Sequence, residues 1–107
     1  MTARHSSLAA GQWEKLSLAE QLGNIGSEVG RAISGADDDS KRAAAERALE
    51  LFDLTLADRR WYGRGSELAR AREVIRDFLC GRNEYRSDPA GLERYFMEFA
   101  LAARLSR

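Results

Sequence analysis

Residues 17–33 read SLAEQLGNIGSEVGRAI, and this stretch decides the fold class. Ser17 and Glu20 have the spacing of a capping box, in which each side chain bonds the other residue's backbone N–H at a helix N-terminus. Apolar side chains then recur at helical spacing and form one stripe, which consists of Leu18, Leu22, Ile25, Val29 and Ile33. The segment therefore predicts an amphipathic helix that buries one face.

A line of small residues runs beside this apolar stripe and includes Gly23, Gly26 and Gly30. Each interior glycine costs a helix about 1 kcal/mol relative to alanine. We expect the close approach of another backbone to offset this cost. The three glycines are therefore predicted positions of close helix packing.

Three further segments have helical periodicity. Residues 40–59 predict a second helix, and residues 59–65 predict a loop because two glycines interrupt the pattern there. A third helix is expected from near Ser66 to Gly81, with the glycine as a left-handed C-cap. Asp88 and Pro89 predict the start of a fourth helix, as an N-cap followed by a proline in the first turn.

Together these segments predict an all-α protein, an antiparallel four-helix bundle with short connections. The chain has 107 residues, which suits one domain. We expect residues 1–12 to be a flexible N-terminal tail and residues 13–107 to form the bundle domain.

The composition argues against several functional classes. No run of about 20 apolar residues is present and the first residues lack the apolar core of a signal peptide, so we expect a cytoplasmic protein with no membrane association. Cys80 is the only cysteine and His5 the only histidine, so neither an intramolecular disulfide nor a closed zinc site can form. We expect Cys80 to be a small buried residue, and we predict no catalytic residue, metal site or cofactor.

Charge is unevenly distributed along the chain. Residues 14–58 contain ten acidic and five basic residues, whereas residues 59–86 contain eight basic and four acidic ones. Arginines beside aromatic rings are typical of surfaces that bind RNA or single-stranded DNA. The predicted nucleic-acid or partner-binding residues, named here the basic segment, are Arg59, Arg60, Trp61, Tyr62, Arg64, Arg70, Arg72 and Arg76. The alternative is a solvated helix whose arginines pair with Glu67, Glu73 and Asp77.

The fourth helix has apolar residues on two sides. Its core stripe is expected to be Leu92, Tyr95, Phe96, Phe99 and Ala103, and a helix apolar on two sides must bury both. The second side predicts a homo-oligomer interface, together with an apolar residue on the charged side of the second helix. The predicted interface residues are Leu54, Met97, Leu101 and Leu105.

A magnesium site is the enzymatic alternative. Acidic residues of the second and third helices could converge on Mg²⁺, namely Glu46, Glu50, Asp53, Glu73 and Asp77. This pattern resembles the all-α nucleotide pyrophosphohydrolases, which hold magnesium with ExxE and ExxD pairs. Glu50 and Asp53 match the second pair, no ExxE pair precedes them, and Glu73 to Asp77 is one residue too long. The resemblance implies hydrolysis of nucleotides.

The stretches LAEQLGNIGSEVGRAI at 18–33, RALELFDLTLAD at 47–58, REV at 72–74 and YFMEFALAAR at 95–104 resemble a family of small prokaryotic helical-bundle proteins. In size and helix count the chain is also similar to the ribosomal intervening-sequence bundles and the accessory proteins of diversity-generating retroelements. Those proteins are homo-oligomers with basic surfaces that bind reverse transcriptase and RNA. This second similarity is one of fold and not of matched residues. The second apolar side of the fourth helix and the basic segment lead us to expect a non-enzymatic, self-associating adaptor for a protein or RNA partner.

Overall fold

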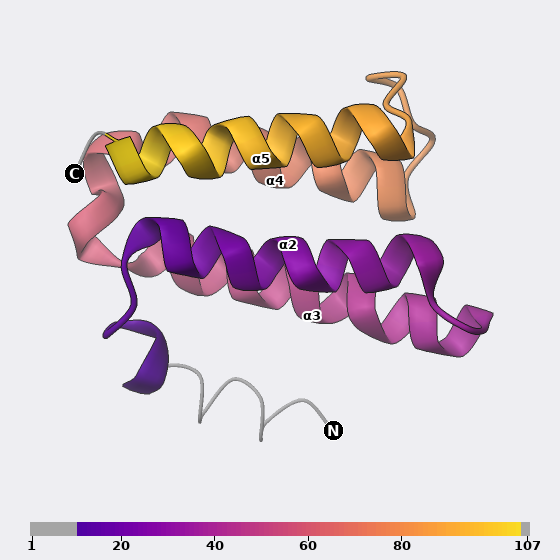
Figure 1. The fold of residues 1–107 in the computed structure, drawn as a ribbon, viewed down its shortest axis with the longest axis horizontal. Helices are drawn as coiled ribbons and strands as arrows, with labels where there is room; N and C mark the ends of the chain where they lie inside the picture. The colour runs from indigo at the N-terminus through magenta and orange to yellow at the C-terminus, as the bar shows by residue number, and fades with distance from the viewer. Residues whose placement is uncertain (1–10, 106–107) are drawn as a thin grey trace.

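The computed structural model describes residues 11–105 and consists, in this range, of helices joined by turns and loops, with no strand (Figure 1). The elements are α2 (Leu18–Ser34), α3 (Asp38–Ala57), the 3₁₀ helix η1 (Arg59–Arg64), α4 (Gly65–Cys80) and α5 (Pro89–Leu105). Gly11 to Trp13 form a helical turn before α2. The prediction of an all-α chain is confirmed. Most of the predicted tail lies outside the described residues.

Side-chain caps fix where the helices begin. Ser17 N donates to Glu20 Oε1 at 2.8 Å and Glu20 N donates to Ser17 Oγ at 3.1 Å, which confirms the capping box of α2. Asp37 Oδ1 accepts from Ser40 N at 2.8 Å, so α3 begins at Asp38 rather than at residue 40. Asp88 Oδ1 accepts from Gly91 N at 2.6 Å in the first turn of α5. The sequence thus sets these boundaries locally.

The four long helices lie in two layers (Figure 1). α2 lies beside α5 nearer the viewer, α3 lies beside α4 behind them, and α2 packs most extensively on α3. The main hydrophobic core draws side chains from all four of these helices. Its most deeply buried side chains are Leu22, Ile25, Phe52, Leu68, Ile75 and Leu92. By contrast, the backbones of α4 and α5 have few close approaches.

Gly26 is the glycine at which α2 and α5 come together. A Cβ atom at Gly26 would lie 3.3 Å from the ring of Phe96, which makes a T-shaped contact with the ring of Phe52 at a centroid distance of 6.1 Å. A Cβ atom at Gly23 or Gly30 would meet no described atom within 4 Å. The expectation of close packing along all three glycines is therefore corrected, because Gly23 and Gly30 face open space.

The connection between α3 and α4 is a 3₁₀ helix and not the predicted loop. Asp58 O accepts from Trp61 N at 3.0 Å, and Asp58 Oδ1 accepts from Arg60 N at 3.1 Å. These bonds satisfy the first N–H groups of η1, which continues into α4 at Gly65 because that glycine has right-handed helical angles. The sequence prediction missed this 3₁₀ helix because glycines at 63 and 65 interrupt the helical pattern and are typical of a loop.

The loop from residue 81 to residue 88 is organised around Asp77. The buried carboxylate of Asp77 accepts hydrogen bonds from Glu84 N at 2.8 Å and from Tyr85 N at 3.0 Å. Asn83 and Arg86 hold the positive φ angles of this loop, at 55° and 56°, whereas Gly81 is extended with φ −105°. The left-handed cap expected at Gly81 is therefore wrong.

Two other side chains differ from expectation. Cys80 is exposed and not buried, because it ends α4 away from the core. Leu54 is half-buried and packs against the hydrophobic core from α3, so it does not lie on a charged outer side. Across residues 11–105, no helix combines the length and apolar character needed to cross a membrane.

Candidate functional site

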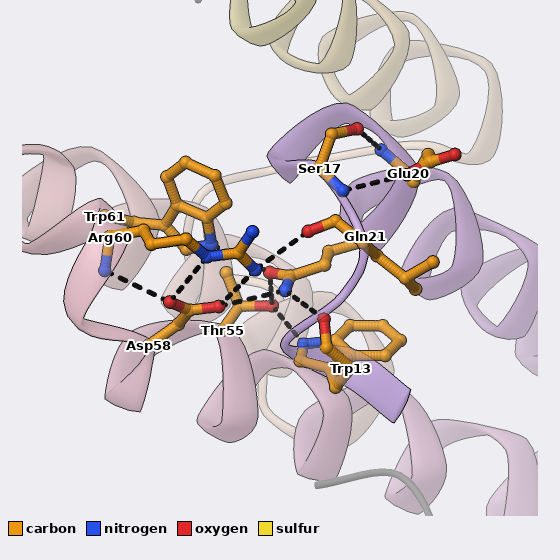
Figure 2. A network of polar contacts seen from close by, with 9 residues as sticks. Trp13, Ser17, Glu20, Gln21, Thr55, Asp58, Arg60 and Trp61 are labelled. Carbon is orange, nitrogen blue, oxygen red and sulfur yellow. Dashed lines mark hydrogen bonds and ion pairs between the residues drawn. The ribbon is translucent and has the colours of Figure 1, made fainter. Parts of the chain in front are cut away.

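A buried polar network lies where the basic segment begins (Figure 2). Its centre is Gln21, a fully buried residue of α2. The amide Nε2 donates to Trp13 O at 2.8 Å and to Asp58 Oδ2 at 3.1 Å. The amide Oε1 accepts from Thr55 Oγ1 and from Trp61 Nε1, both at 3.0 Å. Every donor and acceptor of this amide is therefore satisfied, as burial requires.

The network joins distant parts of the chain. Trp13 Nε1 donates to Thr55 Oγ1 at 3.0 Å, which ties the segment before α2 to the last turn of α3. Gln21 brings in α2, and Trp61 brings in η1. The network thus fixes one end of the helical core, and it determines how η1 presents its outer side chains.

Arg60 and Asp58 form the charged part of this network. Arg60 Nε lies 3.0 Å from Asp58 Oδ1 and Arg60 Nη2 lies 2.7 Å from Oδ2, a bidentate pair. Nη2 also donates to Leu16 O at 2.8 Å, and the guanidinium covers the Trp61 ring at 4.4 Å. Hydrogen bonding to Arg60 lowers the pKa of Asp58 below the ordinary carboxyl value. Arg60 and Trp61 are thus held by contacts within the chain.

Most other arginines of the basic segment are paired with acids. Each ion pair below joins a guanidinium nitrogen to a carboxylate oxygen. The pairs are Arg64 to Glu67 at 3.2 Å, Arg72 to Asp53 at 2.9 Å and Arg76 to Glu73 at 3.8 Å. In the Arg72 pair, Nη2 donates a hydrogen bond to Asp53 Oδ2 at 3.4 Å, whereas Nε has no hydrogen-bond partner in the described structure. The surface expected to bind phosphates is therefore largely charge-compensated.

Five residues of the basic segment are exposed, and three of these form no ion pair within residues 11–105. Tyr62 is 63% exposed and Arg59 is exposed beside it on η1. Arg70 lies on α4, with its guanidinium carbon 5.8 Å from the Tyr85 ring centre. The structure therefore gathers only part of the predicted site.

A groove runs between α4 and α5, with Arg70 and Tyr95 lining both of its hollows. One hollow of about 320 Å³ has Phe99 and Ala102 on its apolar side and Glu67 and Glu98 among its charged residues. The second, of about 360 Å³, extends toward the loop at Tyr85. Burial raises the pKa of Tyr95, so this phenol stays neutral at ordinary pH. Tyr95 was expected in the core and instead faces this groove.

The outer face of α5 carries exposed apolar side chains. Met97 is 69% exposed and Leu101 is 51% exposed, although Leu92 and Phe96 of the same helix are buried. Leu105 ends α5, and its side chain is outside the described part of the structure. α5 is therefore apolar toward the core and also toward solvent.

The acids of the magnesium alternative do not converge. Asp53 pairs with Arg72, Glu73 pairs with Arg76, and Asp77 binds loop amides. Within residues 11–105, no three histidine, cysteine, aspartate or glutamate side chains are grouped so that they could hold a metal ion. The geometry therefore lacks the ligand set that this alternative requires.

The sequence prediction missed the residues that organise the network, especially Gln21 and Thr55. A signal was present for Gln21, because it lies three residues after Leu18 and four before Ile25, on the apolar side of the helix. A polar residue at such a position must find buried partners. The same signal was present for Thr55, which lies three residues after Phe52 and four after Leu51 on the core side of α3.

Comparison of the chain with protein-family models, with curated proteins and with solved structures finds no match.

Proposed function

We propose that this chain is an antiparallel four-helix bundle that serves as a non-enzymatic adaptor and self-associates through the outer face of α5. The observation that carries the proposal is the exposure of Met97 and Leu101 on a helix whose opposite side is already in the core. Burial of apolar surface contributes about 25 cal/mol per Å². Burial of these side chains against a second copy of the chain therefore stabilises the dimer.

The kind of side chain also supports a protein partner. Methionine is enriched at interfaces and adapts its shape to the surface that it meets. Tyr95, two positions before Met97, lies on a different side of α5 and lines the groove with α4. Self-association through Met97 therefore leaves the groove available to a further partner.

The charge pairing makes RNA the second candidate. RNA-binding surfaces need arginines that can neutralise phosphates and rings that can stack on bases. Arg60, Arg72 and Arg76 have acidic partners, and Trp61 donates its N–H to Gln21. Arg59, Tyr62 and Arg70 would carry any remaining contact with nucleic acid.

Self-association can be tested by light scattering coupled to gel filtration over a concentration series. The wild-type chain should increase in mass with concentration, and Met97→Asp and Leu101→Asp should each remain monomeric. Ala69→Asp is the matched control because it adds the same charge at an exposed position of α4. A wild-type chain that stays monomeric throughout the series would overturn the proposal.

The RNA candidate needs its own measurement. In a mobility-shift assay with labelled single-stranded RNA, we expect at most weak binding that disappears between low and physiological salt. Tight binding that is lost in the Arg59→Glu, Tyr62→Ala, Arg70→Glu triple variant would favour RNA as the partner of the adaptor.

A further inference from the structure

We propose that two copies meet through α5 in an antiparallel arrangement, so that Glu93 of one chain faces Arg104 of the partner subunit. This inference rests on the proposed self-association and specifies its geometry. The surface involved, named here the α5 seam, consists of Glu93, Met97, Leu101 and Arg104. All four side chains are exposed.

The spacing of the α5 seam places its members on one side of the helix. Successive members are four, four and three residues apart, and residues at such spacings are neighbours on a helix surface. Two apolar residues therefore lie in the middle, with a negative charge toward the N-terminal end and a positive charge toward the C-terminal end. Within residues 11–105, neither Glu93 nor Arg104 forms an ion pair.

This charge order selects the relative direction of the two helices. With a two-fold axis crossing the seam near residues 98 and 99, Met97 faces the partner's Leu101 and Glu93 faces the partner's Arg104. The midpoint between residues 97 and 101 and the midpoint between residues 93 and 104 differ by about half a residue, or about 1 Å of helix rise, so one two-fold axis serves both pairings. A parallel arrangement would instead place Glu93 against the partner's Glu93 and Arg104 against the partner's Arg104, and like charges repel. The antiparallel pairing alone is complementary.

The open glycines of α2 border this seam. Gly26 contacts Phe96, and Figure 1 shows α2 and α5 running in opposite directions, so Gly23 lies near the level of the stretch from Met97 to Leu101. A Cβ atom at Gly23 would meet nothing within 4 Å among the described residues. A small residue there leaves room for the partner's α5 to approach the backbone of α2. Gly23, whose open side packs against no described residue of the monomer, thus allows close helix packing in the dimer.

Charge reversal tests the pairing. In sedimentation equilibrium at low salt, Glu93→Arg and Arg104→Glu should each raise the dimer dissociation constant about tenfold, because two attractive pairs become repulsive. The double variant should return to within about threefold of wild type, since the pairs are restored in reverse. Additive weakening in the double variant would overturn the inference. Far-ultraviolet circular dichroism checks that each variant keeps its helices.

Disulfide trapping tests the direction independently. In a Cys80→Ser background, chains carrying Met97→Cys and chains carrying Leu101→Cys are mixed, with one of them enlarged by a tag. Antiparallel packing predicts that the mixed dimer predominates after mild oxidation. Predominance of the two homodimers would indicate parallel packing and overturn the inference.

The outcomes separate this inference from the proposed function. If Met97→Asp abolishes dimers while the charge and disulfide variants give the wrong pattern, self-association stands and the antiparallel pairing fails. If the wild-type chain never dimerises, both fail together.

Discussion

The indole N–H of Trp13 donates a hydrogen bond of 3.0 Å to the hydroxyl of Thr55, 42 positions later in the chain. The Thr55 hydroxyl in turn donates a hydrogen bond to Gln21 Oε1, and Gln21 also bonds Trp61 and Asp58. A buried amide with this many partners costs a great deal to remove, because the partners lose their bonds but stay buried.

Replacing Gln21 with leucine should therefore destabilise the chain by about 3 kcal/mol. The leucine matches the neighbouring apolar stripe, but it leaves the Trp61 N–H and the Trp13 carbonyl without their hydrogen-bond partner and removes one of the bonds to Asp58. Urea unfolding followed by circular dichroism measures the loss. Gln12→Leu, at an exposed position, is the control and should change stability by less than about 0.5 kcal/mol. Equal effects of both variants would contradict the role given to the network.

Asp58 should make stability depend on acid pH. Its pKa is lowered in the folded chain by its hydrogen bonds to Arg60, so the ionised carboxylate favours folding. This contribution is complete above the ordinary carboxyl pKa of about 4 and is lost as the pH falls through the lower, folded value. Asp58→Asn should cost about 2 kcal/mol at neutral pH and progressively less below pH of about 4. A difference from wild type that does not change with pH would show that the charge of Asp58 has no role.

Alanine substitutions at Gly23 and at Gly26 of α2 should have opposite effects on stability. In a Met97→Asp background, which we expect to be monomeric, Gly23→Ala should raise the free energy of unfolding by about 0.5–1 kcal/mol. Gly26→Ala should lower it by about 1 kcal/mol, because the new methyl group displaces the Phe96 ring. In the wild-type background Gly23→Ala should weaken self-association. Thermal and urea unfolding measure the first effect, and sedimentation measures the second.

The carboxylate of Asp77 should control the order of the loop that follows α4. Asp77→Ala removes the acceptor of the Glu84 and Tyr85 amides, so these two amides should exchange their hydrogens faster. The global cost is expected to be about 2 kcal/mol. Glu73→Ala, which removes a 3.8 Å surface ion pair on the same helix, should leave both the exchange and the stability almost unchanged.

Local chemistry made much of the fold predictable from sequence. The capping box at Ser17 and the cap at Asp88 are contacts between residues three positions apart, so the residue types and their spacing suffice to define them. The apolar stripe of α2 likewise follows from helical periodicity, and its members Leu22 and Ile25 are fully buried. Such features depend on neighbours within one or two turns.

The remaining features depend on residues that are distant in sequence. Gln21 and Thr55 are 34 positions apart, and Arg72 meets Asp53 across 19 positions, so neither contact has a local signature. Arg60 and Trp61 were expected at a binding surface because their residue types suit one. Only the fold reveals that Arg60 also donates to the carbonyl of Leu16, 44 positions earlier, and that Trp61 donates to Gln21, 40 positions earlier. For the same reason Leu54 could not be assigned to the core from periodicity alone.

Both tryptophans of the chain belong to the same hydrogen-bonded cluster. Intrinsic tryptophan fluorescence therefore reports on one end of the molecule, whereas circular dichroism averages over all the helices. If that end opens before the rest, the emission will change at a lower urea concentration than the ellipticity does. A difference between the two midpoints would thus measure how independently this end of the molecule unfolds.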